Sequence, residues 1–185
     1  MYHIVNDARA KKSADLLVAA TITLTNQKPL NELSIAELQR ESTVSRSTFY
    51  RLFDTPADVL AYACDQMVSE IAVAMPAPTD DSTHQAQLLF IEACMQHVDL
   101  LSALVNSELT ALLRAAHRRQ LSSIFENLHI DQAISEATRD YVNSILADIL
   151  PSAMFVWLVH GRVEDAETVY QQIKASTQVL AALYH

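Results

Sequence analysis

Glycine is almost absent from this chain of 185 residues, which contains a single one, Gly161. Sheet proteins need glycine in hairpin turns and bulges, so its near absence argues against a β-sheet fold. One glycine also cannot build the glycine-rich phosphate loop of a nucleotide-binding enzyme. Alanine, leucine, glutamine and glutamate are abundant and favour helices. The sequence therefore predicts an all-α protein.

Cysteine and long apolar runs are also scarce. The two cysteines, Cys64 and Cys94, cannot form a disulfide framework, and both lie in apolar stretches where buried thiols are expected. No uninterrupted apolar run reaches the roughly 18 residues that cross a bilayer. The polar start, Met1 to Lys12, is unlike a signal peptide. We therefore expect a cytoplasmic protein with no membrane partner.

Motifs for catalysis and metal binding give no support for an enzyme. A di-iron bundle needs a pair of Glu-x-x-His motifs, which the sequence does not contain. The spacings His-x-x-x-His and Cys-x-x-Cys, typical of zinc sites, are absent as well. No cofactor and no metal are expected.

The net charge of −9 is unevenly distributed. Residues 1–53 contain seven Lys and Arg against five Asp and Glu, whereas the remainder contains six against seventeen. A mildly basic N-terminal part on an acidic remainder suits docking on phosphate in one orientation, although scattered surface charge would give the same distribution.

Two short helices joined by a tight turn are predicted after a first helix at about 9–26. Ser34-Ile35-Ala36-Glu37 is a capping box that begins the first of the pair. Ser45 can cap the second, which turns three apolar side chains inward: Val44, Phe49 and Phe53. This arrangement predicts a helix-turn-helix.

The second helix of the pair has the residues of a DNA-reading helix. Arg46, Ser47 and Thr48 at its start can hydrogen-bond base edges. Hydroxyl, phenol or guanidinium groups that can reach phosphate come from Ser45, Tyr50 and Arg51. The predicted DNA contacts also include Ser34 and Lys12. An ordinary solvated helix face is the alternative.

Three basic residues precede the first helix or open it: Arg9, Lys11 and Lys12. They could form an arm that reaches the minor groove or the backbone. A frayed, solvated terminus is the alternative.

The remaining sequence predicts longer helices. Pro56 suits the first turn of a helix that runs to about residue 75 and connects two domains, 1–55 and 56–185. A proline-containing break, Met75-Pro76-Ala77-Pro78-Thr79-Asp80-Asp81-Ser82, follows. Five further helices are expected at about 82–97, 99–105, 107–128, 131–160 and 165–184.

The last two predicted helices contain residues that indicate where they begin or end, and an apolar stretch that indicates contact with a partner subunit. Gly161 can end the longest helix in a left-handed conformation, and Asp165 can cap the last one. The stretch Ala153 to Val159 is apolar on all sides, which predicts burial against a second subunit. Pro151 frees a backbone carbonyl inside the longest helix.

These segments resemble the TetR family of transcriptional regulators. The resemblance rests on Val44-Ser45-Arg46-Ser47-Thr48-Phe49-Tyr50-Arg51-Leu52-Phe53, and the opening Asp7-Ala8-Arg9-Ala10-Lys11-Lys12-Ser13 and the closing Trp157-Leu158-Val159-His160-Gly161 add to it. It implies about nine helices: a three-helix N-terminal head that carries the helix-turn-helix, and a C-terminal ligand-binding and dimerisation bundle. The last two helices would form a homodimer, and ligand binding would change the separation of the two DNA heads.

Three residues depart from the family pattern. Thr43 stands where the turn usually has glycine, and a β-branched residue is costly at positive φ. Leu52 replaces a frequent polar residue and cannot hydrogen-bond a phosphate. Pro56 stands where a phosphate-binding lysine is common. A shallower salt dependence of DNA binding is expected, by roughly one unit per lost phosphate contact.

The effector is an unidentified small, largely apolar molecule. The side chains proposed to line its pocket, or alternatively to form ordinary core, are Tyr62, Met95, His97, Phe125, Tyr141, Met154 and Trp157. Four histidines, His97, His117, His129 and His160, are expected at helix ends or on the surface rather than at a ligand. The function expected is a ligand-responsive regulator, in the repressor class, that binds a palindromic DNA operator as a dimer. The alternative is a helical small-molecule or protein-binding module that has lost DNA binding.

Overall fold

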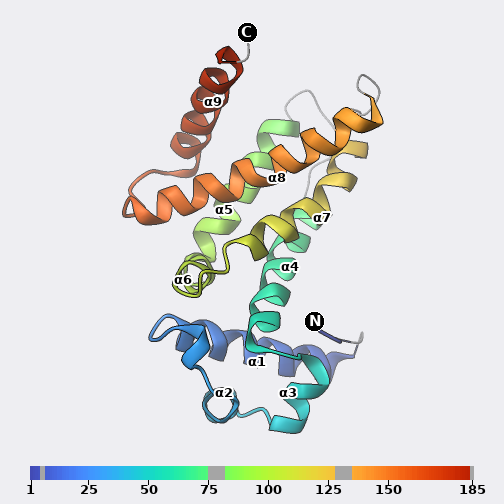
Figure 1. Cartoon of the computed structure of the whole chain (residues 1–185), viewed down its shortest axis with the longest axis vertical. Helices are drawn as coiled ribbons and strands as arrows, with labels where there is room; N and C mark the ends of the chain where they lie inside the picture. Colours follow the sequence, from blue (N-terminus) through green and yellow to red (C-terminus); the bar gives the residue numbers. More distant parts are fainter. Residues whose placement is uncertain (5–6, 75–81, 128–134, 184–185) are drawn as a thin grey trace. The chain divides into compact units, whose positions relative to one another are not determined.

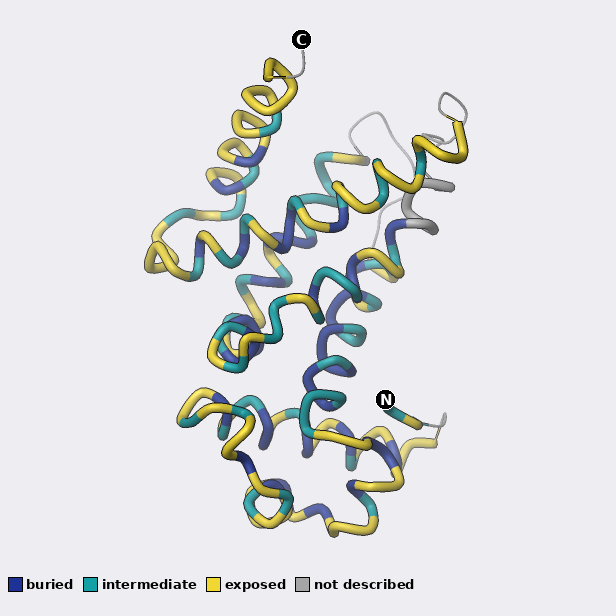
Figure 2. Tube along the Cα trace, in the orientation of Figure 1, coloured by how far each residue is buried: buried dark blue, intermediate teal, exposed yellow. Residues whose placement is uncertain are grey.

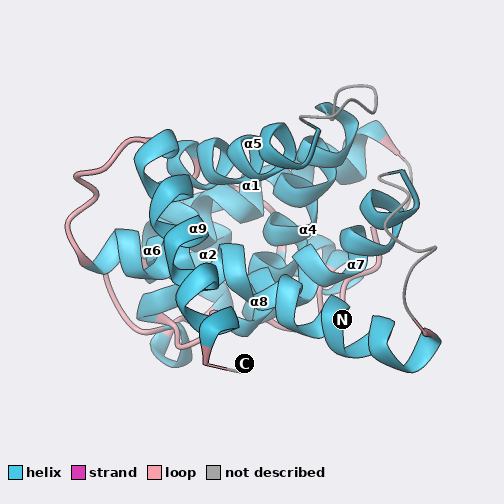
Figure 3. Cartoon of the chain, turned by 90° about the horizontal axis from the view of Figure 1, so that it is seen from above, coloured by secondary structure: helices cyan, strands magenta, loops and turns pink. Residues whose placement is uncertain are grey.

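The computed structural model describes residues 1–4, 7–74, 82–127 and 135–183, and of residues 82 and 122–127 the backbone alone. Over these ranges the chain forms nine α-helices and one 3-10 turn (η1, Leu30–Glu32). The described residues contain no β-strand, only one isolated β-bridge. Figure 3 shows these helices and the loops that join them. The predictions of an all-α fold and of about nine helices are confirmed. The predicted break at 75–81 lies outside the described residues.

The helices gather into two compact units, each described here by itself. The first, which we call the head, consists of Met1–Gln66 and Asp99–Leu113. The second, which we call the body, consists of Met67–Val98 and Arg114–His185. The long helix α4 (Pro56–Ala74) begins in the head and ends in the body.

The head is built on α1 (Ala8–Thr25), α2 (Ile35–Ser42) and α3 (Arg46–Leu52). In Figure 1 these three helices, drawn in blue and cyan, form one group in which α1 packs against both α2 and α3. Their buried residues form one core that includes Leu17, Leu38, Phe49 and Phe53. The aromatic pair of α3 therefore anchors that helix, as its four-residue spacing predicts.

Local signals determine the ends of α2 and α3. The Ser34 hydroxyl accepts a hydrogen bond from the Glu37 amide, and the Glu37 carboxylate accepts one from the Ser34 amide, so the predicted capping box is present. Thr43 ends α2 with a φ of 58°, in the left-handed region. Ser45 then caps α3 by accepting from the Thr48 amide.

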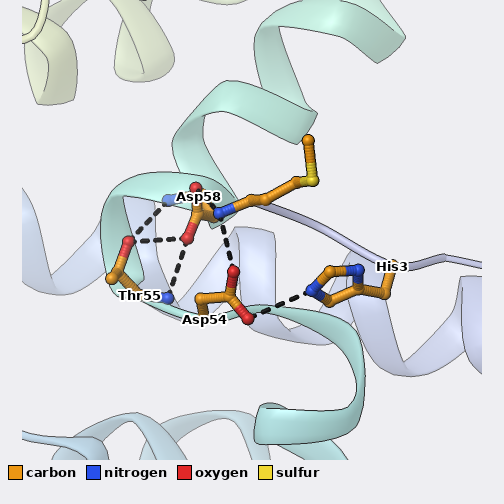
Figure 4. Close-up of polar contacts among 5 residues, drawn as sticks. His3, Asp54, Thr55 and Asp58 are labelled. Carbon is orange, nitrogen blue, oxygen red and sulfur yellow. Dashed lines mark hydrogen bonds and ion pairs between the residues drawn. The ribbon is translucent and has the colours of Figure 1, made fainter.

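The N-terminal segment adds a short backbone pairing beside α3. Tyr2 forms an antiparallel bridge with Phe53, and the His3 amide donates to the Leu52 carbonyl at 2.8 Å. Figure 4 shows the side chains that surround this pairing: His3 contacts Asp54, while Thr55 and Asp58 cap the start of α4 with reciprocal hydrogen bonds. The same Asp54 and Asp58 carboxylates pair with the Met1 amine. This pairing fixes the C-terminal end of α3.

The body contains α5 (Ser82–Gln96), α8 (Glu136–Val159) and α9 (Ala166–Ala182), and α9 packs against both of the others. The helix α6 (Val98–Asn106) belongs to the head from Asp99 on, and α7 (Ala111–Asn127) begins in the head and continues in the body. The structure begins α7 later than the predicted 107, because Glu108 adopts a φ of 57° and interrupts the helix. The predicted start of α8 at 131 lies outside the described residues.

The predicted ends of α8 and α9 are confirmed. Gly161 has a φ of 90°, its amide donates to the Leu158 carbonyl, and the Arg162 amide donates to the Trp157 carbonyl. These two bonds form a Schellman motif. Asp165 caps α9 by accepting from the Thr168 amide at 2.8 Å.

Helix α8 is apolar but incompletely covered. Among the described helices it is the single unbroken one long and apolar enough to cross a bilayer, although core helices of soluble proteins meet the same criterion. Its most apolar stretch has 28% of its residues buried. Figure 2 shows exposed positions alternating with buried ones along both α8 and α9. Much of the apolar surface of α8 is therefore free to contact a partner.

Candidate functional site

Helix α3 presents a polar, solvent-facing surface of five side chains. Exposed along the helix and at its cap are Ser45, Arg46, Ser47, Tyr50 and Arg51, with Thr48 half-buried. Phe49 and Leu52 are buried on the opposite side. The buried side holds the helix in the head, and the exposed side presents groups of the kinds that can hydrogen-bond base edges or phosphate.

Hydrogen bonds and one cation–π contact order this surface. The Ser45 hydroxyl lies 3.0 Å from that of Ser47 and 2.9 Å from that of Thr48. The Arg46 guanidinium carbon lies 5.5 Å from the Tyr50 ring centroid, a distance at which the ring attracts the cation. The structure thus brings together all six residues that the sequence predicts as the centre of the DNA contact.

Leu52 does not belong to this surface. Its side chain is 1% exposed and lies in the head core. A polar residue here would point into the core as well, so the interpretation of Leu52 as a lost phosphate contact is wrong. Pro56 begins α4, as predicted, and is half-buried.

The other predicted DNA contacts lie outside α3. Ser34 is exposed at the start of α2, where its hydroxyl donates to Glu37 at 2.7 Å. Lys12, with Arg9 and Lys11, is exposed on α1. Asp7 caps α1 ahead of these three residues, so all three lie in the first turns of that helix, and their contact with DNA stays a prediction.

Lys28 and Glu37 form an ion pair beside the capping box, with Nζ and Oε1 2.6 Å apart. The Lys28 ammonium, together with hydrogen bonds from the Ser34 hydroxyl and amide, lowers the pKa of Glu37 from 4.5 to about 2. The carboxylate that begins α2 therefore stays ionised at all physiological pH values.

The body contains a cavity of about 430 Å³. Its lining is chiefly aliphatic and comes from five helices: Val68, Ile71 and Ala72 of α4; Thr83, Ala86, Gln87 and Phe90 of α5; His117 and Leu121 of α7; Leu146, Ile149 and Leu150 of α8; Tyr170, Ile173, Lys174 and Thr177 of α9. This volume and composition are typical of small-molecule sites.

His117 is the buried polar side chain of this cavity. It is 4% exposed, stacks on Phe90 with ring centroids 4.5 Å apart, and its Nδ1 lies 3.2 Å from the Ala147 carbonyl oxygen. Pro151, four residues after Ala147, has no amide hydrogen to donate to that carbonyl. The carbonyl that Pro151 frees, which the sequence predicts, is therefore satisfied by His117.

The position of His117 corrects the expectation of a surface histidine. It lies four residues from both Leu113 and Leu121, which are buried, so the apolar stripe of α7 places it inside. Burial lowers its pKa, while the Ala147 carbonyl and Asp148 act in the opposite direction. Two sequence signals could have identified His117 as a buried residue. One is the apolar spacing of α7, and the other is the need for a hydrogen-bond donor to the carbonyl that Pro151 leaves free.

Of the seven residues proposed for the pocket, the six whose side chains are described are not among those that line this cavity. Tyr62 belongs to the head core, where it stacks on Phe53. Tyr141 is exposed on α8, and Met154 is fully buried away from the lining. Met95 is half-buried on α5, and His97 is exposed after it.

The other two residues of the proposed set are Trp157 and Phe125. Trp157 lies instead in a groove between α8 and α9, where its Nε1 donates to the Glu164 carbonyl at 3.0 Å. The Phe125 side chain and His129 lie outside the described residues. The described members of the proposed set thus lie in cores, on the surface or in the groove, whereas aliphatic residues dominate the wall of this cavity, and the position of the effector site stays a prediction.

The described part of the chain shows no candidate site for a metal ion. There, no group of three or more His, Cys, Asp or Glu side chains is arranged to hold a metal ion. The sequence does contain one Glu-x-x-His stretch, Glu126 to His129, whose side chains are not among those described. A di-iron site needs two such motifs.

Sequence comparisons do not identify the chain. No protein-family model and no curated protein matches it. Cys64 and Cys94 are both buried and form no disulfide with each other, as expected of structural thiols.

Solved structures do resemble this one. Lin0861 from Listeria innocua has a TM-score of 0.81 at 15% identity, over 97% of each chain. A putative TetR-family transcriptional regulator from Syntrophomonas wolfei has a TM-score of 0.65 at 15% identity, over 93% of this chain and 96% of that one. A TetR-family regulator from Streptomyces coelicolor has a TM-score of 0.58 at 20% identity, over 93% of this chain and 85% of that one. The chain therefore has the fold of the TetR-family transcriptional regulators.

Proposed function

We propose that this protein is a ligand-responsive transcriptional regulator that binds a palindromic DNA operator as a homodimer in the cytoplasm. The observation that carries the proposal is the surface of α3, where arginine, serine and tyrosine side chains are exposed on a helix anchored by buried aromatic residues. A helix of this kind fits the major groove of B-DNA.

Exposed apolar side chains on α8 and α9 support the homodimer. On α8 they are Tyr141, Ile145, Val156 and Val159, and on α9 they are Val179, Leu180 and Leu183. A groove between the two helices runs past several of them. Apolar surface gathered on two neighbouring helices favours a second copy of the same surface as its partner, in the symmetric manner of most homodimers.

The cavity of the body supports a response to a small molecule. It is largely aliphatic and is lined by residues of five helices. Binding that differs between two arrangements of the protein would shift its affinity for DNA. A regulator released from its operator by such a ligand acts as a repressor, and we assign that role.

Selection from random DNA duplexes tests the proposal. The purified protein should enrich a near-palindrome with half-sites about 34–36 Å apart, one helical turn, or a multiple of that spacing. A double variant, Arg46→Ala with Arg51→Ala, should enrich nothing, since both removed side chains are exposed. If the unaltered protein enriches no sequence, the alternative of a binding module without DNA affinity is correct.

A further inference from the structure

The cavity of the body holds one polar side chain that is almost fully buried and has a ring nitrogen without a partner. His117 uses Nδ1 for the Ala147 carbonyl, and no described residue hydrogen-bonds its Nε2. His117 lines the cavity, and a ligand that displaced water from it without bonding Nε2 would leave that nitrogen unsatisfied, which is costly. Such an atom in the wall of a cavity indicates where a ligand would bond.

The hydrogen bond to Ala147 fixes which proton the ring carries. A carbonyl oxygen can only accept, so Nδ1 must hold the hydrogen and donate it. In the neutral imidazole, Nε2 is then an acceptor. Burial favours this neutral form, because it lowers the pKa of His117.

The remaining wall excludes a buried charge on the ligand. Among the described residues of the lining, Lys174 is the one lysine, arginine or carboxylate residue, and its side chain is exposed. Phe90 lies against His117 in this lining, and Leu121, Leu146 and Leu150 belong to the same cavity wall; all four lack charge. A carboxylate placed beside them would be desolvated without a cation to pair with.

We propose that the effector is an uncharged, mainly apolar molecule with one hydroxyl group, alcohol or phenol, that donates its hydrogen bond to Nε2 of His117. This inference rests on the proposed function, because it names the ligand class of the regulatory cavity. The ligand hydroxyl would give His117 a second hydrogen bond, in addition to the one that its Nδ1 makes with the Ala147 carbonyl of α8.

Three matched probes test the proposal by calorimetric titration of the full chain. They are 4-hexylphenol, its methyl ether 4-hexylanisole, and 4-hexylbenzoate. The ether keeps the shape but cannot donate, so it should bind about tenfold more weakly than the phenol, the loss of roughly one neutral hydrogen bond. The benzoate should bind more weakly still. An ether or benzoate that binds as tightly as the phenol overturns the proposal, as does a failure of the phenol to bind.

Two variants locate the interaction. His117→Asn keeps an amide near the position of Nδ1 to serve Ala147 but removes Nε2, so phenol and ether should bind it equally. Gln87→Met removes the amide side chain found among the described lining residues, which also offers an acceptor, and should keep the preference for the phenol. The opposite pattern, in which Gln87→Met loses the preference and His117→Asn keeps it, contradicts the role of His117.

Selection from random DNA duplexes, carried out with no phenol, ether or benzoate present, distinguishes a failure of the ligand class from a failure of the proposed function. A protein that enriches a palindrome but does not distinguish phenol from ether disproves the ligand class alone. A protein that distinguishes the probes but enriches no DNA disproves the regulatory role and leaves the cavity chemistry standing.

Discussion

The guanidinium of Arg46 lies over the face of Tyr50, one turn further along α3, at 5.5 Å from the ring centroid. Both side chains are exposed, so the contact is worth about 0.5–1 kcal/mol and is easily exchanged for a contact with DNA. It keeps the arginine near the start of the helix while the groove is empty. The pair therefore links the predicted base-reading position, Arg46, to the predicted phosphate-binding position, Tyr50.

Replacing Arg46 with alanine should relax the sequence preference of DNA binding. We expect a loss of roughly 1–3 kcal/mol on the selected operator, because an arginine can form two hydrogen bonds with guanine. On unrelated duplexes the loss should be small. Gel-shift titrations on both kinds of DNA measure this difference, and an equal loss on all sequences would contradict base reading by Arg46.

Tyr50→Phe is the matched control for that variant. It keeps the ring under the Arg46 guanidinium but removes the hydroxyl that can reach phosphate. Affinity should fall by a similar factor on every duplex, with the preference for the operator retained. A change of preferred sequence in this variant would assign base reading to Tyr50 instead.

Thr43→Gly should stabilise the protein by about 1 kcal/mol. Thr43 adopts a φ of 58°, a conformation in which a β-branched side chain is strained and glycine is not. Urea denaturation at a fixed protein concentration measures the change. Thr43→Val keeps the branching and should give no gain, so an equal gain from both variants would exclude relief of strain as the cause.

Val156→Asp and Leu180→Asp should each convert the proposed dimer to monomer. Both side chains are more than half exposed on the apolar surface of α8 and α9, and a carboxylate there would be buried without a partner in a symmetric interface. Analytical ultracentrifugation reports the mass. Val73→Asp is the control, since Val73 is exposed on α4, and dissociation by this variant would place the interface elsewhere.

The architecture of the head follows closely from its sequence because its signals are local. The Ser34–Glu37 capping box, the Ser45 cap and the spacing of Phe49 and Phe53 each lie within one helical turn. Such signals determine helix ends without reference to the rest of the chain. The outlier is Leu52, whose burial depends on how α3 packs against the head core.

The cavity could not be predicted in the same way, because its wall comes from five helices. Which faces of α5, α8 and α9 meet depends on packing between residues far apart in sequence. The aromatic residues that suggest a pocket, such as Tyr62, fill a core instead. The freed carbonyl of Ala147 was predictable from Pro151, but its partner His117 comes from another helix.

Below pH 4.5 the ion pair of Glu37 should make the stability of the head depend on pH. The pKa of Glu37 is about 2 in the folded protein against 4.5 ordinarily. The stabilisation from its charge is therefore complete above pH 4.5 and is lost as the pH falls towards 2. Glu37→Gln should flatten this part of the profile of unfolding free energy against pH.

Lys28→Met separates the two causes of that pKa shift. The variant removes the ammonium but leaves the hydrogen bonds from Ser34. The pKa of Glu37, followed by NMR of its carboxyl carbon, should rise part of the way to 4.5. An unchanged pKa would show that the capping box alone holds the carboxylate in its charged form.

A double-mutant cycle on His117 and Pro151 should reveal their shared dependence on the Ala147 carbonyl. His117→Ala removes the donor 3.2 Å from that oxygen and leaves a buried acceptor unpaired. In a Pro151→Ala background the new amide can donate to the same carbonyl within α8. The destabilisation by His117→Ala should then be smaller by about 1 kcal/mol, while the loss from the emptied space is common to both backgrounds. Urea denaturation of the four proteins measures the coupling, and strictly additive effects would show that the two residues act independently.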